Sequence, residues 1–357
     1  MNTAFWKGKN ILITGHTGFK GGWLSLWLQS IGSNVVGYSL EPSTNPALFN
    51  VARVSEGMFK SHIADVRDLV KLKQICEEFK PDVVFHMAAQ PLVKYSYENP
   101  VETYSTNVMG TVHLLEVVRQ IGCVKVVVNV TSDKCYENRE WVWGYRENDP
   151  MGGYDPYSNS KGCAELVTSA YRQSFFNPSS FDEHGTALST VRAGNVIGGG
   201  DWANNRLVPD IIRALAEGKT AVIRNPAAIR PWQYVLEPLR GYLMLAEKLW
   251  DNGIEYSEGW NFGPNDEDTK SVGWIAERLV DLWGNGSRWE RDSAEHPHEA
   301  TSLKLDCSKA KTRLAWRPLM DLTTALEKVV EWYRSYESGN NMREITLKQI
   351  NDYAQLF

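Results

Sequence analysis

The chain has 357 residues, of which 43% are hydrophobic and 23% charged, with a formal net charge of −5 and an isoelectric point near 5.9. This composition predicts a globular protein of one large unit or two lobes, and it excludes the broad basic surface that nucleic acids or anionic membranes attract. No segment reaches the roughly 18 consecutive apolar residues that cross a bilayer, and the N-terminus has no apolar signal core. Five scattered cysteines without a CxxC pair predict free thiols in a reducing cytoplasm.

Short β-branched runs alternate with amphipathic stretches through the first half of the chain. The pattern predicts buried parallel strands at residues 10–14, 34–39, 83–86 and 124–130, with helices at 21–31, 69–79 and 100–121. A further helix is predicted to begin near Pro156, with Asp155 as its N-cap, before a strand at 186–192. This alternation predicts an α/β fold with a doubly wound (Rossmann) parallel sheet.

The pattern changes from Gly194 onward. Gly198, Gly199 and Gly200 predict a flexible link, and helices are expected at 208–217, 238–250, 272–283 and 322–336. We predict a smaller, interleaved C-terminal lobe. Residues 1–194 and a later segment near 225–258 would form the doubly wound domain, and residues 195–224 and 259–357 the smaller lobe.

A glycine-rich turn lies at the first predicted strand–helix junction. Glycines let the chain turn sharply and bring backbone N–H groups close to a pyrophosphate, while a helix N-terminus favours negative charge. The spacing is GxxGxxG rather than GxGxxG, and a purely structural turn is the competing interpretation. The position of the motif favours a dinucleotide cradle, with these candidate residues: Gly15, Thr17, Gly18, Phe19, Lys20 and Gly21.

The ends of the next strands offer further candidates for holding a dinucleotide. The second strand ends at Ser39, where an acidic residue usually binds the adenosine ribose of NAD. This serine and Lys20 leave NADP open beside NAD. Asp65-Val66 are candidates for the adenine, and Ala88-Ala89 for the path of the cofactor, with ordinary strand-end turns as the alternative.

Tyr157 and Lys161 form a YxxxK pair on the helix that starts near Pro156. Residues four apart share one helix face, so the phenol and the ammonium group can point into one cleft. A nearby lysine and an oxidised nicotinamide would favour the phenolate and lower the pKa of Tyr157. Such a pair also arises by chance on solvated helices, but here it follows a glycine turn and a strand ending at Ser132.

These motifs resemble those of the extended short-chain dehydrogenase/reductases, and within them the CDP-glucose 4,6-dehydratases. The resemblance covers nearly the whole chain and is most specific at residues 192–203 (RAGNVIGGGDWA) and 230–235 (RPWQYV). It implies that the Rossmann domain binds NAD and that the smaller lobe binds a nucleotide-linked sugar. It further implies C4 oxidation, C5/C6 elimination of water and return of the hydride to C6.

The resemblance also assigns roles to individual residues. Tyr157 would deprotonate the sugar 4-hydroxyl, Lys161 would support the phenolate and the nicotinamide ribose, and Ser132 would hydrogen-bond the 4-oxygen. Elimination needs two more proton-transfer groups, for which Asp133 is the candidate acid and Lys134 the candidate base. Related dTDP-glucose dehydratases carry Asp-Glu there, so a basic Lys134 must be made neutral by desolvation or by the cofactor charge. The competing interpretation is that Lys134 pairs with a carboxylate or phosphate.

Arginines suit a pyrophosphate because they bind it in bidentate geometry. Arg206 and Arg230 are the candidate ligands, with contributions from Asn195 and His298, while surface salt bridges are the alternative for the arginines. Trp202 and Trp232 are candidates for packing on the base or sugar, with structural packing as the alternative. No spacing of His, Cys, Asp and Glu predicts a metal site.

Several functions remain open at this stage. The alternatives are a dehydratase acting on dTDP-glucose or GDP-mannose, a nucleotide-sugar 4-epimerase, and an NAD-responsive binding module. The pair Asp133-Lys134 argues against an epimerase, which needs no elimination. The resemblance also implies deoxysugar synthesis for lipopolysaccharide O-antigen, and a homodimer that pairs the helices at 100–121 and 156–175.

Overall fold

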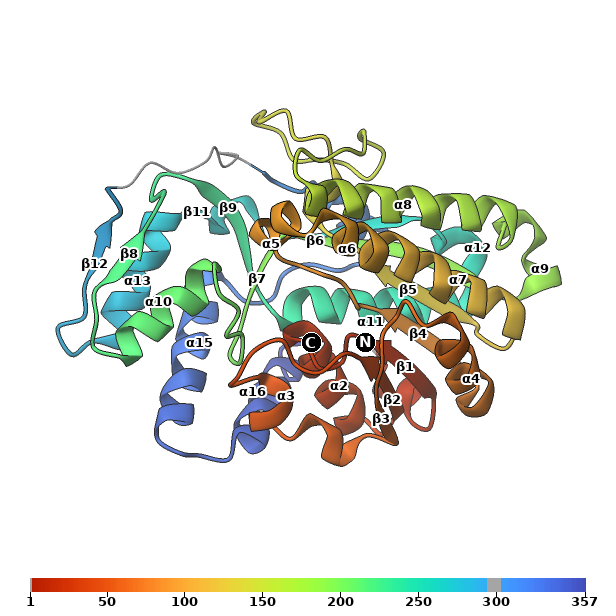
Figure 1. Ribbon diagram of the computed structural model, residues 1–357, viewed down its shortest axis with the longest axis horizontal. Helices are drawn as coiled ribbons and strands as arrows, with labels where there is room; N and C mark the ends of the chain where they lie inside the picture. The colour runs from red at the N-terminus through yellow and green to blue at the C-terminus, as the bar shows by residue number, and fades with distance from the viewer. Residues whose placement is uncertain (1, 294–302) are drawn as a thin grey trace.

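A parallel β-sheet with helices on both faces forms the centre of the molecule (Figure 1). In a computed structural model that describes residues 2–293 and 303–357, seven strands follow the order β10-β6-β5-β4-β1-β2-β3, and every neighbouring pair is parallel. The strands are β1 (Asn10–Thr14), β2 (Asn34–Ser39), β3 (Lys60–Ile63), β4 (Val83–His86), β5 (Val126–Val130), β6 (Ala187–Ala193) and β10 (Gly259–Phe262). Chain order reverses between β1 and β4, and ligands bind at this point in doubly wound sheets.

Alternate residues of each central strand face opposite layers of helices, because successive side chains point to opposite sides of a sheet. Ile11 and Ile13 pack in one core, and Leu12 packs in the other. The first layer contains α2 (Phe19–Ser30), α11 (Leu236–Asp251) and α16 (Met342–Ala354). The second contains α4 (Leu69–Phe79), α7 (Gly110–Ile121) and α8 (Pro156–Ser174). Short helices complete the connections: α1 (Thr3–Trp6), α3 (Leu48–Val51), α5 (Val93–Glu98), α6 (Pro100–Tyr104), α9 (Phe181–His184), α12 (Gly253–Tyr256) and α14 (Ser308–Arg313).

Two small sheets and three helices lie beside the carboxyl edge of the main sheet, on the left of Figure 1. One sheet contains β7 (Asn195–Ile197), β9 (Ile229–Tyr234) and β11 (Thr269–Ser271), and the other contains β8 (Ala221–Ile223) and β12 (Trp289–Arg291). The helices are α10 (Leu207–Ala216), α13 (Val272–Trp283) and α15 (Leu322–Glu337).

The predicted doubly wound α/β fold is confirmed, and several elements have the predicted bounds. Asp155 caps α8, since its Oδ1 accepts the Ser158 N–H at 2.9 Å and Pro156 occupies the first helical position. The helix predicted at 100–121 is instead interrupted, because a π-helical turn at Ser105–Met109 separates α6 from α7.

The division into two lobes stays a prediction, but two elements lie outside its proposed boundaries. β10 belongs to the main sheet although residues from 259 onward were assigned to the smaller lobe. The C-terminal helix α16 packs on α2 of the doubly wound part. Both differences arise because apolar strands and helices far along the chain complete a core that begins at the N-terminus.

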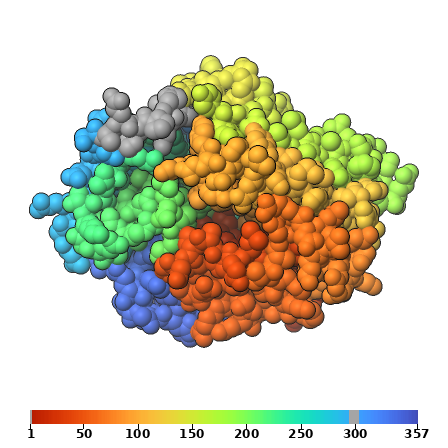
Figure 2. Space-filling view, viewed as in Figure 1, coloured from red at the N-terminus to blue at the C-terminus, as the bar shows by residue number. Residues whose placement is uncertain are grey.

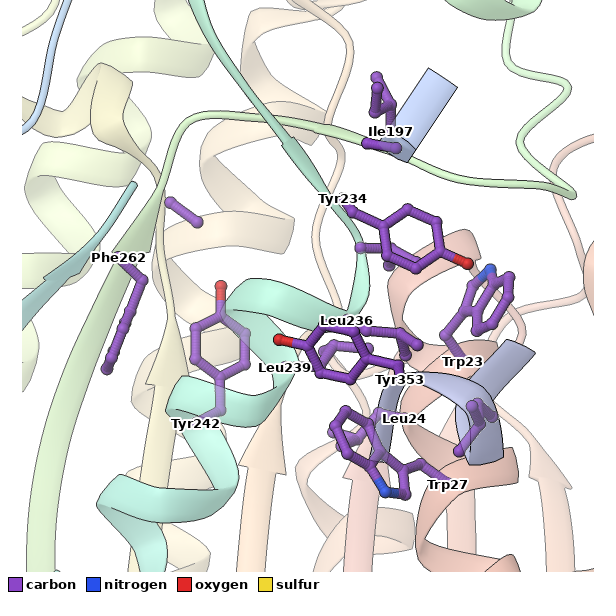
Figure 3. Packing of buried hydrophobic residues seen from close by; sticks show 14 of the residues in the cluster. Trp23, Leu24, Trp27, Ile197, Tyr234, Leu236, Leu239, Tyr242, Phe262 and Tyr353 are labelled. Carbon is purple, nitrogen blue, oxygen red and sulfur yellow. The ribbon is translucent and has the colours of Figure 1, made fainter. Parts of the chain in front are cut away.

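The expectation of a flexible link at Gly198, Gly199 and Gly200 is wrong. All three glycines are buried, and a Cβ built on Gly199 would lie 2.0 Å from Cγ of Trp332. The Gly199 carbonyl accepts the indole N–H of Trp23 at 2.9 Å, in the aromatic core where Trp23 packs edge-on against Tyr234 (Figure 3). Glycine is therefore required here for close packing rather than for mobility.

Within the described part of the chain, no helix combines the length and apolar character needed to cross a bilayer.

Candidate active site

The glycine turn between β1 and α2 is closed by backbone contacts that only glycine permits. Gly15 has φ +79°, and a Cβ on it would lie 2.7 Å from the Ala88 backbone nitrogen. A Cβ on Gly21 would lie 2.1 Å from the Gly15 carbonyl oxygen. Gly18 precedes α2 and provides no side-chain cap, so the first N–H groups of this helix remain available to an anion. Phe19 and Lys20 begin the helix, and both are partly buried.

The residues predicted to line a cofactor lie at the carboxyl ends of β2, β3 and β4. The Thr17 hydroxyl lies 2.8 Å from the Ser39 hydroxyl, which fixes Ser39 to the glycine turn. The Asp65 carboxylate pairs with Arg67, whose Nε lies 3.0 and 2.9 Å from its two oxygens, and this pairing lowers the pKa of Asp65. Val66 is buried against Gly110. The Ala88 N–H donates to Thr14 Oγ1 at 3.2 Å, and the partly buried Ala89 follows it.

His16 is a buried residue of the same turn that sequence analysis passed over. Its Nε2 lies 2.7 Å from Ser61 Oγ, and its ring packs against Gly37, where a Cβ would lie 2.3 Å from the ring. Burial lowers the pKa of His16 to about 4, so the ring is neutral at physiological pH. His16 therefore links the turn to β2 and β3. The missing signal was Gly37 inside a buried strand, which indicates close approach of another group.

The three groups that the sequence predicted to converge do so at the end of β5. Tyr157 and Lys161 lie one turn apart on α8, and both are buried. Ser132 follows β5 and hydrogen-bonds Tyr157, which acts to lower the pKa of the phenol. The ammonium group of Lys161 donates to the Val130 carbonyl at 3.3 Å.

Burial dominates the ionisation of this group of residues. It raises the pKa of Tyr157 to about 12 and lowers the pKa of Lys161 to about 8, with Lys20 as the next cause for Lys161. Lys20 itself has its pKa lowered to about 8 by burial and by the nearby Arg206 charge. The lowered pKa predicted for Tyr157 beside both Lys161 and an oxidised nicotinamide stays a prediction, and in the protein alone desolvation of the phenolate outweighs the opposing effects of Ser132 and Arg206.

Asp133 is buried at 3% exposure next to this group. Its Oδ1 accepts the Ser132 hydroxyl at 3.0 Å, and burial raises its pKa against the opposing effects of Lys134, Ser132 and Arg230. A carboxyl group with a raised pKa can act as a proton donor near neutral pH. Lys134 is partly buried beside it, and its backbone N–H donates to Ser132 Oγ at 3.2 Å.

A buried ion pair fixes α8 to the sheet behind the catalytic residues. Both oxygens of Glu165 bind Arg192 on β6, each at 2.8 Å, and both side chains are at most 5% exposed. Thr131 and Thr190 donate to the same carboxylate at 2.5 and 2.7 Å. Sequence analysis included Arg192 only as part of a motif and missed Glu165, because the pair joins two elements, α8 and β6, at positions 27 residues apart.

The candidate substrate residues lie in the segments that carry the two small sheets and α10. Arg206 pairs with Asp201 at 2.8 Å, and its positive charge acts on Tyr157. Arg230 and Asn195 lie on neighbouring strands β9 and β7, and the charge of Arg230 acts on Asp133. Trp202 packs in a cluster with aromatic residues of α15, as the structural interpretation predicted. His298 lies outside the described residues.

Figure 2 shows a hollow at the centre of one face, bounded by N-terminal segments in red and orange and by green segments of the smaller lobe. In residues 2–293 and 303–357, no group of three or more His, Cys, Asp or Glu side chains is arranged to hold a metal ion.

Comparison with known proteins decides the family. The family described as GDP-mannose 4,6 dehydratase matches residues 12–329. The chain belongs to this family. It is 59% identical to the CDP-glucose 4,6-dehydratase of Salmonella typhimurium over 349 residues, which cover 98% of this chain and 97% of that protein. The resemblance to extended short-chain dehydrogenase/reductases predicted from the motifs is thus confirmed.

Solved structures share the fold at lower identity. The dTDP-glucose 4,6-dehydratase of Bacillus anthracis, in complex with NAD, has a TM-score of 0.76 and 22% identity, covering 94% of this chain and 100% of its own. The UDP-glucose 4-epimerase of Thermotoga maritima, with UDP-glucose, has a TM-score of 0.78 and 22% identity, covering 92% and 99%. At these identities the likeness establishes the fold alone.

The substitution Asp133→Asn should raise thermal stability at neutral pH. Between the ordinary carboxyl pKa and the raised pKa of the folded state, the unfolded chain loses its proton first, so wild-type stability falls as pH rises through this window. Asparagine has no such ionisation. We expect a higher melting temperature for the variant at pH 7, and no difference below about pH 4. Asp281→Asn, at an exposed position of α13, is the matched control. A variant no more stable than wild type at pH 7 would contradict the assignment of a raised pKa.

Proposed function

We propose that this chain is an NAD-dependent nucleotide-sugar 4,6-dehydratase that converts CDP-D-glucose to CDP-4-keto-6-deoxy-D-glucose. The observation that carries the proposal is the convergence of Ser132, Tyr157 and Lys161 beside a buried Asp133 whose pKa is raised. The choice of CDP-glucose among nucleotide-sugars is supported by the name of the relative at 59% identity.

The residues around the glycine turn fit a dinucleotide. The uncapped N-terminus of α2 and the tight packing of Gly15 and Gly21 leave backbone N–H groups at the place where a pyrophosphate binds in this fold. Thr17 and Ser39 would lie along the adenosine ribose, Asp65 and Val66 near the adenine, and Ala88 and Ala89 along the path to the nicotinamide. NAD supplies a hydride acceptor for C4 of the sugar and the donor for C6. Ser39 in place of an acidic residue keeps NADP as an alternative.

Tyr157 and Lys161 account for proton transfer at the 4-oxygen. Ser132 donates a hydrogen bond to this oxygen, and Tyr157 takes the hydroxyl proton. Because burial holds the phenol in its neutral form, the positive charges of Lys161 and of the oxidised cofactor are needed to stabilise the phenolate. Lys161 would also hold the nicotinamide ribose.

Asp133 and Lys134 account for loss of water. The 4-ketone acidifies the proton at C5, Lys134 removes it, and Asp133 protonates the 6-hydroxyl as it leaves. Arg206, Arg230 and Asn195 would hold the diphosphate, and His298 is a further predicted contact. A nucleotide-sugar 4-epimerase eliminates no water and would not use a buried acid at this position. The epimerase is therefore the second candidate function. A silent NAD-responsive module is disfavoured by the complete set of catalytic side chains.

We also propose that the protein is a homodimer and works in the cytoplasm. The α6–α8 face carries large apolar side chains in contact with solvent, with Val101 81% and Leu166 60% exposed. α6 and α8 lie side by side, joined by the hydrogen bond from Tyr104 to Asn159 at 2.9 Å. A matching pair of helices from a second copy would bury this face. All five cysteines are free, which suits a reducing compartment.

The assay that tests the activity is turnover of CDP-glucose, dTDP-glucose, UDP-glucose and GDP-mannose, with mass spectrometry of the product. We expect loss of one water and a 4-keto chromophore in base, fastest with CDP-glucose. Formation of a 4-epimer without water loss would refute the dehydratase assignment. Faster dehydration of another nucleotide-sugar would refute only the choice of substrate.

Replacing Lys134 by alanine should abolish exchange of the C5 hydrogen with solvent. General-base catalysis contributes about a hundredfold or more, so turnover should fall by at least that factor while C4 oxidation continues. The measurements are deuterium incorporation at C5 and the rate of NADH formation in a single turnover. Lys219→Ala, at an exposed lysine paired with Glu217, is the control. Unchanged exchange would remove Lys134 from the mechanism.

Replacing Leu166 by arginine should convert the dimer to a monomer, because a buried unpaired charge opposes association. Analytical ultracentrifugation reports the mass. Val222→Arg, at a 55% exposed position of β8, should leave the dimer intact. A Leu166→Arg variant that sediments like wild type would place the interface elsewhere.

A further inference from the structure

Three buried polar atoms, one on the candidate acid and two on residues that contact Phe262, have no hydrogen-bond partner among the described residues. They are Oδ2 of Asp133, Oε1 of Gln233 and the hydroxyl of Tyr242. All three side chains are at most 3% exposed. Leaving such buried atoms without a hydrogen bond is destabilising, so each needs a partner that the protein itself does not provide.

The amide oxygen of Gln233, Oε1, can only accept hydrogen bonds. Its Nε2 donates to the Phe262 carbonyl at 2.8 Å, and since a carbonyl can only accept, the orientation of the amide is fixed. Oε1 is therefore the amide atom that points away from the Phe262 carbonyl. Pro231 and Gln233 are two residues apart on β9 and lie on the same face of the strand. Pro231 packs against Gly194, where a built Cβ would lie 2.7 Å from the proline ring and 3.2 Å from Oδ2 of Asp133.

Tyr242 approaches the same region from α11. Its ring packs edge-on against Phe262, with the centroids 5.7 Å apart, and Figure 3 shows its hydroxyl directed toward the N-terminal end of α11. Gly241 makes this possible, since a Cβ there would lie 2.4 Å from the Phe262 ring. Burial raises the pKa of Tyr242 and the negative charge of Asp133 raises it further, so the phenol remains a neutral donor and lies within electrostatic reach of the carboxyl group.

We propose that Gln233 and Tyr242 are positioning residues for Asp133, and that the three groups share one buried water molecule. The proposal rests on the proposed role of Asp133 as the acid. Buried waters usually make about three hydrogen bonds to otherwise unsatisfied groups, which is the number available here.

This water satisfies both protonation states of the carboxyl group. With Asp133 protonated, the proton is carried by Oδ1, the oxygen beside Ser132, while Oδ2 accepts a hydrogen bond from the water, which also donates to Gln233 and accepts the Tyr242 O–H. During elimination, the proton of Asp133 moves to O6 as the C6–O6 bond breaks, the C5–H proton moves to Lys134, and the electron pair forms the C5–C6 double bond. The water then donates to the new carboxylate and to Gln233, and accepts the Tyr242 O–H. The carboxyl group changes charge without having to move.

Other charged and titratable groups also affect the pKa of Asp133. Lys134 on its own turn and Arg230 on β9 lower its pKa. The remaining titratable groups that interact with its charge are Lys20 on α2, Tyr157 on α8 and Cys135.

The test is Tyr242→Phe in single-turnover and steady-state assays with CDP-glucose. Losing one hydrogen bond to the water should lower kcat about five- to tenfold and leave KM within twofold, because the substrate is not contacted. Oxidation at C4 should proceed at the wild-type rate, so NADH absorbance should accumulate before elimination. The weaker stabilisation of the carboxylate should also move the alkaline limb of the kcat profile to higher pH. Gln233→Met should give the same signature and covers the case in which the first variant fails to fold.

Tyr234→Phe is the matched control, because this buried hydroxyl on β9 donates to Gln349 at 2.8 Å instead. It should leave kcat and the NADH transient unchanged. Wild-type elimination in both Tyr242→Phe and Gln233→Met would overturn the inference, as would a loss of C4 oxidation in proportion to kcat. The Asp133→Asn variant distinguishes failure of the positioning role from failure of the proposed dehydratase mechanism. If that variant still eliminates water, the acid role of Asp133 fails. If it accumulates NADH while Tyr242→Phe behaves as wild type, only the positioning role fails.

Discussion

The buried pair between Glu165 and Arg192 is the interaction on which the site depends. It joins α8 to β6, and Thr131 at the end of β5 donates to the same carboxylate. Lys161 lies one turn and Tyr157 two turns before Glu165 on that helix, so the pair fixes their position relative to Ser132. Removing one partner of a buried pair leaves an uncompensated charge and is strongly destabilising, whereas an intact pair adds little net stability. Its contribution is therefore geometric.

Burial determines the chemistry of the groups that this scaffold positions. Lys20 and Lys161 have their pKa values lowered to about 8, and Tyr157 and Asp133 have theirs raised. Each shift favours the neutral form, because desolvation penalises charge. A site in this condition responds strongly to an incoming charge, since few water dipoles screen it. The positive nicotinamide and the negative diphosphate are thus expected to change the protonation of these residues more than the residues change one another.

Enzymes that catalyse different reactions share this fold. A dehydratase and an epimerase are about equally similar to this chain in structure, with TM-scores of 0.76 and 0.78. Functional differences must then reside in a few side chains at the carboxyl edge of the sheet. Asp133, Lys134, Gln233 and Tyr242 are the set that we propose here, with the first two as the acid and the base of elimination.

The local sequence determined the alternation of strands and helices, the glycine turn, the cap at Asp155 and the spacing of Tyr157 and Lys161. These features depend on residues close together in the chain, so periodicity and turn chemistry are enough to predict them. The identities of Ser132, Asp133 and Lys134 as candidates came from the family resemblance. Their roles remain predictions.

Only the tertiary structure revealed the partner of Arg192, the neutral His16 against Gly37, and the place of Gly199 beneath Trp332. It also showed that burial raises the pKa of Tyr157 in the protein without its cofactor, and that polar atoms of Gln233 and Tyr242 are buried without a hydrogen-bond partner among the described residues. Each of these depends on segments separated by tens to hundreds of residues, and on how much water their packing excludes. Contacts between distant segments and the exclusion of water by their packing cannot be read from the spacing of residues along the chain.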